Sequence, residues 1–239
     1  MSIESFSDDC TRRVLFSLEP DHHSHQLTAS LPVEPRWLAT VNILALIGLY
    51  FALPERLTLG PTWLIPAVVL SLLIPAVISH RKRQTRLNVV LGIALLLVIT
   101  AAEIWSLSIL IAGLPGKRQP PAELLRSAAA LWVSNILVFA SWYWRLDAGG
   151  PHKRYLRASH TEGAFLFPQM TLPPDSKLFK LDWKPDFIDY LFLAFNTSTA
   201  FSPTDAPVLS RWAKLLMMIQ PAISLSTIAI LAARAINIL

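Results

Sequence analysis

Long apolar runs, separated by short polar turns, dominate the chain. Four of them follow one another at about residues 37–53, 61–79, 87–114 and 124–146, and a fifth covers residues 212–239. Roughly 20 predominantly apolar residues cross the hydrocarbon core of a bilayer as an α-helix. These runs therefore predict membrane-spanning helices in an all-α integral membrane protein.

The segment 187–203 is harder to assign. Its first half is apolar, and its second half is rich in hydroxyl side chains. At about 1.5 Å per residue it forms only about 26 Å of helix, which is a marginal length for a crossing. It either crosses as a thin sixth span or enters and leaves on one side as a re-entrant segment. We expect a bundle of six transmembrane helices, with five helices plus one re-entrant segment as the alternative.

Two polar regions complete the organisation. Residues 1–35 carry many charged side chains and no apolar signal-peptide core, so they predict a polar N-terminal arm. Residues 147–184 are rich in proline, glycine and basic residues, which predicts a cytoplasmic loop. The chain then divides into the arm, a four-helix transmembrane region at 36–146, this loop, and a C-terminal part at 185–239 that holds the hydroxyl-rich segment and the last span.

Charged residues are sparse, and the basic ones indicate an orientation. Charged residues of both signs make up only 15% of the chain, against about a quarter in globular proteins, and the formal net charge is +5. Because lysine and arginine concentrate on cytoplasmic loops, the basic turn at 80–86 and the loop 147–184 favour a cytoplasmic N-terminus. We therefore interpret the basic residues as topology markers. The expected partner is the lipid bilayer, and we expect no nucleic acid.

Glu103 is the most informative ionisable residue. It lies near the middle of the third run, with Thr100 and Ser106 about one helical turn away on the same face. A carboxylate in the membrane is costly, so it suggests an ion or proton site facing a cavity. The simpler alternative is a structural carboxylate that is hydrogen-bonded to a neighbouring helix.

Further polar candidates follow in the C-terminal part. The hydroxyl-rich stretch could line an aqueous path or coordinate an ion through the side chains of Asn196, Thr197, Ser198, Thr199 and Asp205. Packing is the competing explanation, because Ala194, Ser198 and Ser202 recur at every fourth position and would let two helices approach closely.

The last run carries a polar stripe formed by Gln220, Ser224 and Thr227, with Pro221 expected to loosen the helix. Together with Glu103 and the hydroxyl-rich stretch, this stripe would form a polar bundle interior.

Metal, cofactor and hydrolase chemistry find little support. Cys10 is the single cysteine, so the chain offers no disulfide and no paired thiol ligands. Three histidines in the arm, His22, His23 and His25, lack a compact ligand set, and we predict no metal and no cofactor. His160 in the loop is accompanied by no nucleophile elbow or zinc-binding helix motif, so we assign no catalytic residue.

Two resemblances add to this interpretation. The segments "WYWRLDAGGP", "FLFPQM" and "FNTSTAFSPTD" resemble stretches typical of a family of uncharacterised bacterial multi-span membrane proteins, over roughly the C-terminal 100 residues. That resemblance implies a bacterial inner-membrane location and no particular activity. More distantly, residues 190–239 resemble the pore module of two-span potassium channels. The place of the channel filter reads "TSTAFSPTD" and has no glycine, so the backbone freedom of a potassium filter is missing.

The function most consistent with these features is a transport or channel-like role with a polar bundle interior. The substrate would be a small ion or solute, and the chain could act as a homo-oligomer. The alternative is a structural or partner-binding membrane protein whose polar residues serve helix packing. A membrane-embedded enzyme is the third option.

Overall fold

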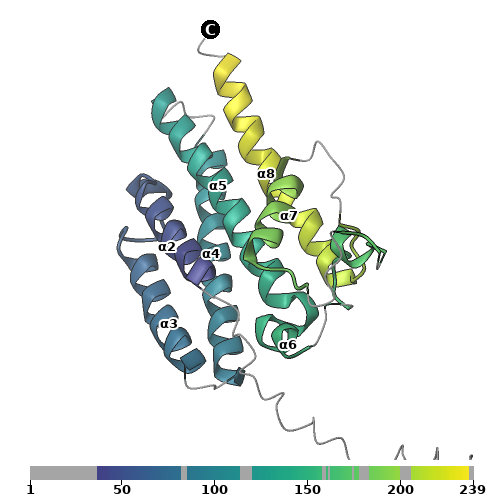
Figure 1. Cartoon of the computed structure of the whole chain (residues 1–239). Helices are drawn as coiled ribbons and strands as arrows, with labels where there is room; N and C mark the ends of the chain where they lie inside the picture. Colours follow the sequence, from purple (N-terminus) through teal and green to yellow (C-terminus); the bar gives the residue numbers. More distant parts are fainter. Residues whose placement is uncertain are drawn as a thin grey trace, which may run out of the picture. The chain divides into compact units, whose positions relative to one another are not determined.

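The computed structural model describes residues 37–81, 85–113, 120–157, 160, 162–173, 175–177, 183–199 and 206–236. Seven α-helices fall within these ranges (Figure 1): α2 (Trp37–Phe51), α3 (Leu64–Arg81), α4 (Thr85–Ala112), α5 (Pro121–Leu146), α6 (Pro151–Leu156), α7 (Phe187–Thr199) and α8 (Arg211–Ile236). The described residues contain no extended strand, only an isolated bridge between Phe165 and Val208. The prediction of an all-α protein is confirmed.

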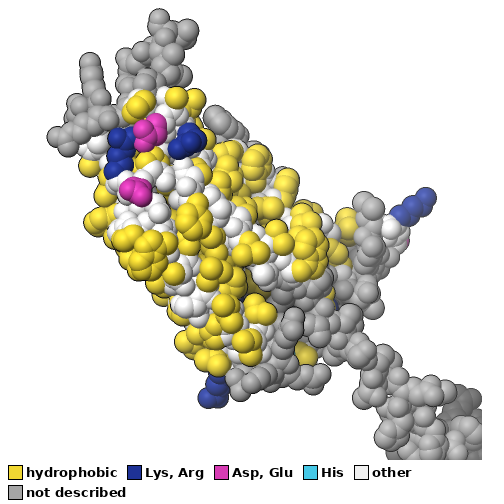
Figure 2. Space-filling model, turned by 90° about the vertical axis from the view of Figure 1, so that its left-hand side faces the viewer, with side chains coloured by type: hydrophobic (Ala, Val, Ile, Leu, Met, Phe, Trp, Pro, Cys, Tyr) yellow, Lys and Arg dark blue, Asp and Glu magenta, His cyan; other side chains and the backbone are white. Residues whose placement is uncertain are grey.

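Among the described residues, three helical stretches are long and apolar enough to cross a membrane: Arg86–Ala112, Ala122–Gly149 and Arg211–Ala233. Two shorter apolar helices, Trp37–Phe51 and Leu64–Ser79, accompany them. Figure 2 shows a face covered mostly by apolar side chains, and large hydrophobic residues are exposed along the helices, among them Ile74, Val90, Leu97 and Met218. A continuous apolar surface of this kind suits a lipid environment.

Proline positions explain two helix boundaries. Helix α3 begins at Leu64, so Pro66 lies in its first turn, where the missing N–H leaves no helical bond unmade. Helix α5 begins with Pro121 for the same reason. Pro75 lies inside α3, and Pro221 lies inside α8, where the sequence predicts it.

Helix α5 is the centre of the bundle. It packs against α2 and α4 on one side and against α7 and α8 on the other (Figure 1). Its end leads into a tight turn at 147–150, where Ala148, Gly149 and Gly150 all have positive φ values of 52°, 79° and 91°. A Cβ at Gly150 would lie only 2.9 Å from the carbonyl oxygen of Arg145, so glycine is required there. This turn places α6 against the end of α5.

Helices α7 and α8 run parallel to each other. The Gln220 side chain donates to the carbonyl of Ala194, and four residues further along both helices the Ser224 hydroxyl donates to the carbonyl of Ser198, each at 2.6 Å. A pairing that advances in step along both chains requires the same direction. Two adjacent full crossings would instead run antiparallel.

The segment before α8 explains how two consecutive helices can run in the same direction. Leu166 N donates to the carbonyl of Pro207 and Leu209 N donates to that of Ala164, which ties residues 207–209 to the loop after α5. Helix α7 also begins beside that loop, because Tyr190 contacts Asp147. The chain therefore returns after α7 to the end of the bundle from which α7 starts. Both C-terminal helices therefore start at that end of the bundle, beside the loop after α5.

Candidate functional site

Ser198 and Ser224 form a close polar contact between α7 and α8. The Ser224 hydroxyl donates to the Ser198 carbonyl at 2.6 Å, and the two hydroxyl oxygens are 2.8 Å apart. Because the single Ser224 proton is already committed, the Ser198 hydroxyl is the donor in the second bond. Both side chains are fully buried, as is Ala194 one turn earlier. Small residues thus allow close approach of the two helices, and their hydroxyls are satisfied within the protein.

Gln220 extends this contact to α5. Its Oε1 accepts a hydrogen bond from the Tyr143 hydroxyl at 2.6 Å, while its Nε2 donates to the carbonyl of Ala194 at 2.6 Å. Asn135 Nδ2 makes a long contact of 3.5 Å to the Gln220 carbonyl. We call the buried set Asn135, Tyr143, Ser198, Gln220 and Ser224 the polar seam. It joins three helices through side-chain amides and hydroxyls.

The neighbouring threonines bond within their own helices. Thr197 donates to the carbonyl of Leu193, Thr199 to that of Asn196, and Thr227 to that of Ser224. Thr197 and Thr227 are buried, whereas Asn196 and Thr199 at the end of α7 are half-buried. Two further candidates, Ser202 and Asp205, lie outside the described residues.

Glu103 lies elsewhere. It lines a cavity of about 30 Å³ together with residues of α2, α3, α4 and α5. The side chain is only 5% exposed, and neither carboxylate oxygen has a hydrogen-bond partner within the described part of the chain. Thr100 and Ser106, which share its helix face, bond instead to the carbonyls of Leu96 and Ala102.

Helix α5 separates the cavity from the polar seam. Ser134 lines the cavity, while the next residue, Asn135, belongs to the seam. Among the described residues, no side chain of α7 or α8 lines the cavity. The structure therefore brings Ser198, Gln220 and Ser224 together and leaves Glu103 apart from them, so the expected single polar interior is divided into two.

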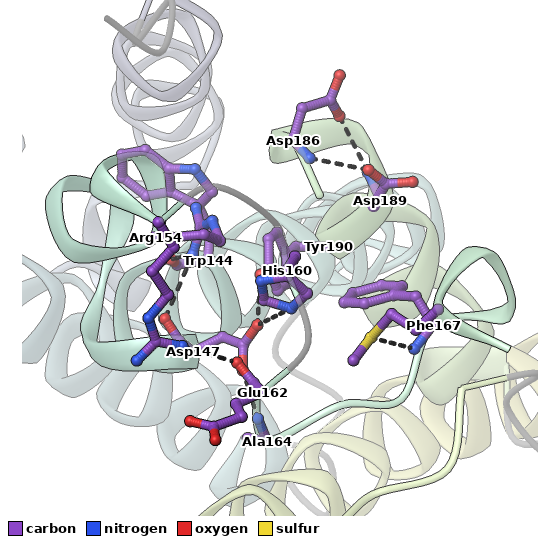
Figure 3. A network of polar contacts seen from close by, with 12 residues as sticks. Trp144, Asp147, Arg154, His160, Glu162, Ala164, Phe167, Asp186, Asp189 and Tyr190 are labelled. Carbon is purple, nitrogen blue, oxygen red and sulfur yellow. Dashed lines mark hydrogen bonds and ion pairs between the residues drawn. The ribbon is translucent and has the colours of Figure 1, made fainter. Parts of the chain in front are cut away.

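A third polar group lies at the end of α5, where the loop packs (Figure 3). Asp147 is fully buried and accepts hydrogen bonds from Ala164 N at 2.5 Å and from the Tyr190 hydroxyl at 2.6 Å. The Arg154 guanidinium donates to the carbonyls of Trp144 and Asp147 and stacks 5.1 Å from the Tyr190 ring centroid. These contacts connect α5, α6 and the first turn of α7.

His160 completes this network. Its Nε2 lies 3.7 Å from Oδ2 of Asp147, and its ring contacts the rings of Phe167 and Trp183. Burial lowers the pKa of His160 below the ordinary 6.5, the nearby Asp147 acts in the opposite direction, and Arg154 and Arg157 lower it further. Neither ring nitrogen has a hydrogen-bond partner among the described residues. A histidine held neutral in this way is sensitive to acid.

Comparison with known protein families, with characterised proteins and with solved structures finds no match to this chain. The two resemblances therefore stay predictions, and the chemistry has to be judged from the geometry alone.

The geometry shows which polar side chains are available for chemistry and which are enclosed by the protein. The side chains of Asp147 and His160 are fully buried, so they do not present a solvent-accessible acid–base pair. Within the described residues no group of three or more histidine, cysteine or acidic side chains is placed to hold a metal ion. Glu103 beside its cavity is a buried carboxyl group with no hydrogen-bond partner at either oxygen among the described residues.

Sequence reasoning missed Asp147, Tyr190 and Tyr143 as structural contacts. Asp147 and Tyr190 are 43 residues apart in the chain, and Tyr143 and Gln220 are 77 apart. The available signal was one acidic residue directly after an apolar run, followed by two glycines in "WYWRLDAGGP". An acid at such a position needs a partner when it is buried.

Proposed function

We propose that this chain is a bacterial inner-membrane protein with a transport or channel-like role, built from five crossing helices and one re-entrant half-helix. The observation that carries the proposal is the parallel arrangement of α7 and α8. Helix α7 has 13 residues, about 20 Å of helix, and then the chain returns to its starting end. Non-helical backbone at membrane depth is tolerated only where protein buries it or where it lines a water-filled cavity.

Half-helices that end inside the membrane are typical of ion and substrate sites in transporters, because their free ends present polar backbone groups there. The last turn of α7 adds side chains of the same character, with Asn196 and Thr199 half-buried and Thr197 and Ser198 buried. The substrate class is a small ion or solute.

A cytoplasmic N-terminus then places the loop after α5 and the entry of α7 on the cytoplasmic side. The turn between α3 and α4 belongs to that same side, which agrees with the hydrogen bond from the Arg145 guanidinium at the end of α5 to the Asn88 carbonyl near the start of α4. At the opposite end, Arg56 and Glu123 form an ion pair. The basic turn and the basic loop share one side in this arrangement, as the positive-inside rule requires.

Cysteine labelling tests this topology, because Cys10 is the single native thiol and Cys10→Ser gives a thiol-free background. Single cysteines would replace Glu55, Lys177 and Leu209, which are all exposed. A membrane-impermeant maleimide is expected to label positions 177 and 209 in inside-out vesicles and position 55 in right-side-out vesicles. Labelling of position 209 from the same side as position 55 would establish six full crossings and overturn the re-entrant arrangement.

Flux into proteoliposomes tests the role itself. The purified chain is expected to carry protons, sodium or potassium above empty liposomes, and Glu103→Gln combined with Asn196→Ala is expected to reduce that flux. Glu55→Gln is the matched control, because Glu55 is an exposed carboxylate outside the long helices. No flux above empty liposomes, or flux unchanged in the double variant, would overturn the proposal.

One observation favours a second candidate, a structural or partner-binding membrane protein. The polar seam between α5, α7 and α8 is largely satisfied by its own hydrogen bonds, which is what helix packing requires. This candidate predicts a stable complex, either a homo-oligomer or a co-purified partner, together with an absence of flux.

A further inference from the structure

Glu103 is a buried acid that makes no side-chain hydrogen bond within the described bundle. Its side chain is 5% exposed, both carboxylate oxygens lack hydrogen-bond partners there, and it lines a cavity of about 30 Å³. A cavity needs about 10–15 Å³ to hold one water molecule, so this one has room for roughly two. An unpartnered buried polar group in a folded protein requires an explanation, such as a bound water molecule, a bound ion or a reactive role.

The described residues that line the cavity supply no compensating charge for Glu103. Helix α2 contributes Tyr50 as the only other titratable side chain among the cavity-lining residues, and α3 contributes apolar residues. Helix α5 contributes Ser134 between apolar neighbours, and Ser106 of the same helix uses its proton on the Ala102 carbonyl. An ionised carboxylate in such a place costs several kcal/mol, and it is compensated only by a bound proton or a bound cation.

The choice between a proton and a metal cation follows from the oxygen atoms on offer. Hard cations take about six to eight oxygen ligands, often several of them carboxylates or carbonyls. The cavity offers one carboxyl group and the hydroxyls of Tyr50, Ser106 and Ser134, and its other lining side chains are apolar. A proton needs only the carboxylate, with a water molecule to deliver it.

We propose that Glu103 is a proton-binding site, a carboxylic acid that takes up and releases its proton through the cavity between α2, α3, α4 and α5. The inference deepens the proposed function by naming the proton as the ion that the protein would carry or couple to. It rests on that function only for the role in transport, since proton binding is a property of the folded chain.

Tyr50 connects the cavity with the turn between α2 and α3. Its side chain lines the cavity, and its hydroxyl accepts a hydrogen bond of 3.0 Å from Leu59 N in the exposed turn between α2 and α3. Leu53, just beyond the end of α2, lines the same space. The cavity therefore extends toward this turn, which is the outer end when the N-terminus is cytoplasmic. Proton exchange is expected from that end.

Dicyclohexylcarbodiimide is the probe that tests the site, because it reacts with protonated carboxyl groups in apolar surroundings. The purified full chain in detergent would be treated at acidic and alkaline pH, with and without sodium or potassium salts, and then mapped by mass spectrometry. The expected result is an adduct on Glu103 that decreases at alkaline pH, is not suppressed by either salt, and is lost in Glu103→Gln. Glu55→Gln, the exposed control, is expected to leave the adduct unchanged.

Two outcomes would overturn the proposal. Suppression of the adduct by sodium or potassium would show a metal-cation site, and the absence of any adduct on Glu103 would show that reagent and proton do not reach it. Infrared spectroscopy supplies a measurement on the unmodified protein, in which the carbonyl stretch of a protonated acid is expected in the wild type and in Glu55→Gln but not in Glu103→Gln. An unchanged band in Glu103→Gln would also overturn it.

The outcomes remain separate from those of the proposed function. A Glu103 adduct without flux would contradict transport and leave the proton site in place. Flux without an adduct on Glu103 would contradict the proton site and leave the transport role in place.

Discussion

The Tyr190 hydroxyl donates a hydrogen bond of 2.6 Å to the Asp147 carboxylate, and this contact ties the first turn of α7 to the end of α5. Asp147 also holds Ala164 N, so the same carboxylate fixes the loop segment that pairs with residues 207–209 ahead of α8. One buried acid thereby sets where both C-terminal helices begin. Its loss is expected to disturb α7 and α8 together.

The Tyr190→Phe variant isolates this contact. Removing one hydrogen bond to a buried carboxyl group is expected to lower the free energy of unfolding by about 1–3 kcal/mol. Thermal unfolding in detergent, followed by tryptophan fluorescence, would measure the change. A double-mutant cycle with Asp147→Asn provides the control, and an equal effect of Tyr190→Phe in both backgrounds would show that the two residues are not coupled.

Ser198→Leu tests the close approach of α7 and α8. Leucine has no space beside the fully buried Ser224, so we expect a loss of about 1–3 kcal/mol from overpacking. Ser198→Ala should cost only about 0.6 kcal/mol, typical of an interhelical hydrogen bond in a membrane protein. Ser226→Leu is the matched control, because Ser226 lies on a more exposed face of α8 and donates to the Ala222 carbonyl of its own helix. Equal melting temperatures for Ser198→Leu and Ser226→Leu would contradict the close packing of α7 against α8 at Ser198.

Acid is expected to destabilise the loop network through His160. Burial lowers the pKa of folded His160 below 6.5, whereas the unfolded side chain titrates near 6.5. Between these two values the unfolded chain binds more protons, so stability falls as the pH drops below about 6.5, by at most about 1.4 kcal/mol per pH unit. Melting temperatures measured across this range would show the slope.

His160→Phe keeps a ring beside Phe167 and Trp183 and removes the titrating group. This variant is expected to flatten the slope, while His152→Asn, at an exposed position of α6, keeps it. A slope that is unchanged in His160→Phe would assign the acid sensitivity to other groups.

Two helical glycines give a matched comparison. A Cβ at Gly92 of α4 would overlap the guanidinium of Arg145, whereas a Cβ at Gly48 of α2 meets nothing within 4 Å. Alanine is a better helix former than glycine by about 1 kcal/mol, so Gly48→Ala is expected to stabilise the protein. In Gly92→Ala the guanidinium must move away from the Asn88 carbonyl, which offsets this gain by about 1 kcal/mol. The melting temperature of Gly48→Ala should be higher than that of Gly92→Ala, and the opposite order would contradict the close approach of Arg145 to Gly92.

The sequence by itself determined the helices. Runs such as 87–114 and 124–146 are too long and too apolar for anything but buried or lipid-facing helices, and the structure contains α4 and α5 at those places. Apolar length and proline positions are local properties, which is why they can be recognised in the chain.

Only the tertiary structure decided the direction of α7 and the grouping of the polar residues. A 13-residue apolar helix is compatible with either direction, since neither its length nor its composition records where the following chain goes. The pairing of Ala194 with Gln220 and the return of residues 207–209 to the loop after α5 decide it. Glu103 and Gln220 likewise carry the same polar signal in sequence, but α5 lies between them, so one is bonded in the seam and the other remains an unpartnered acid in its own cavity.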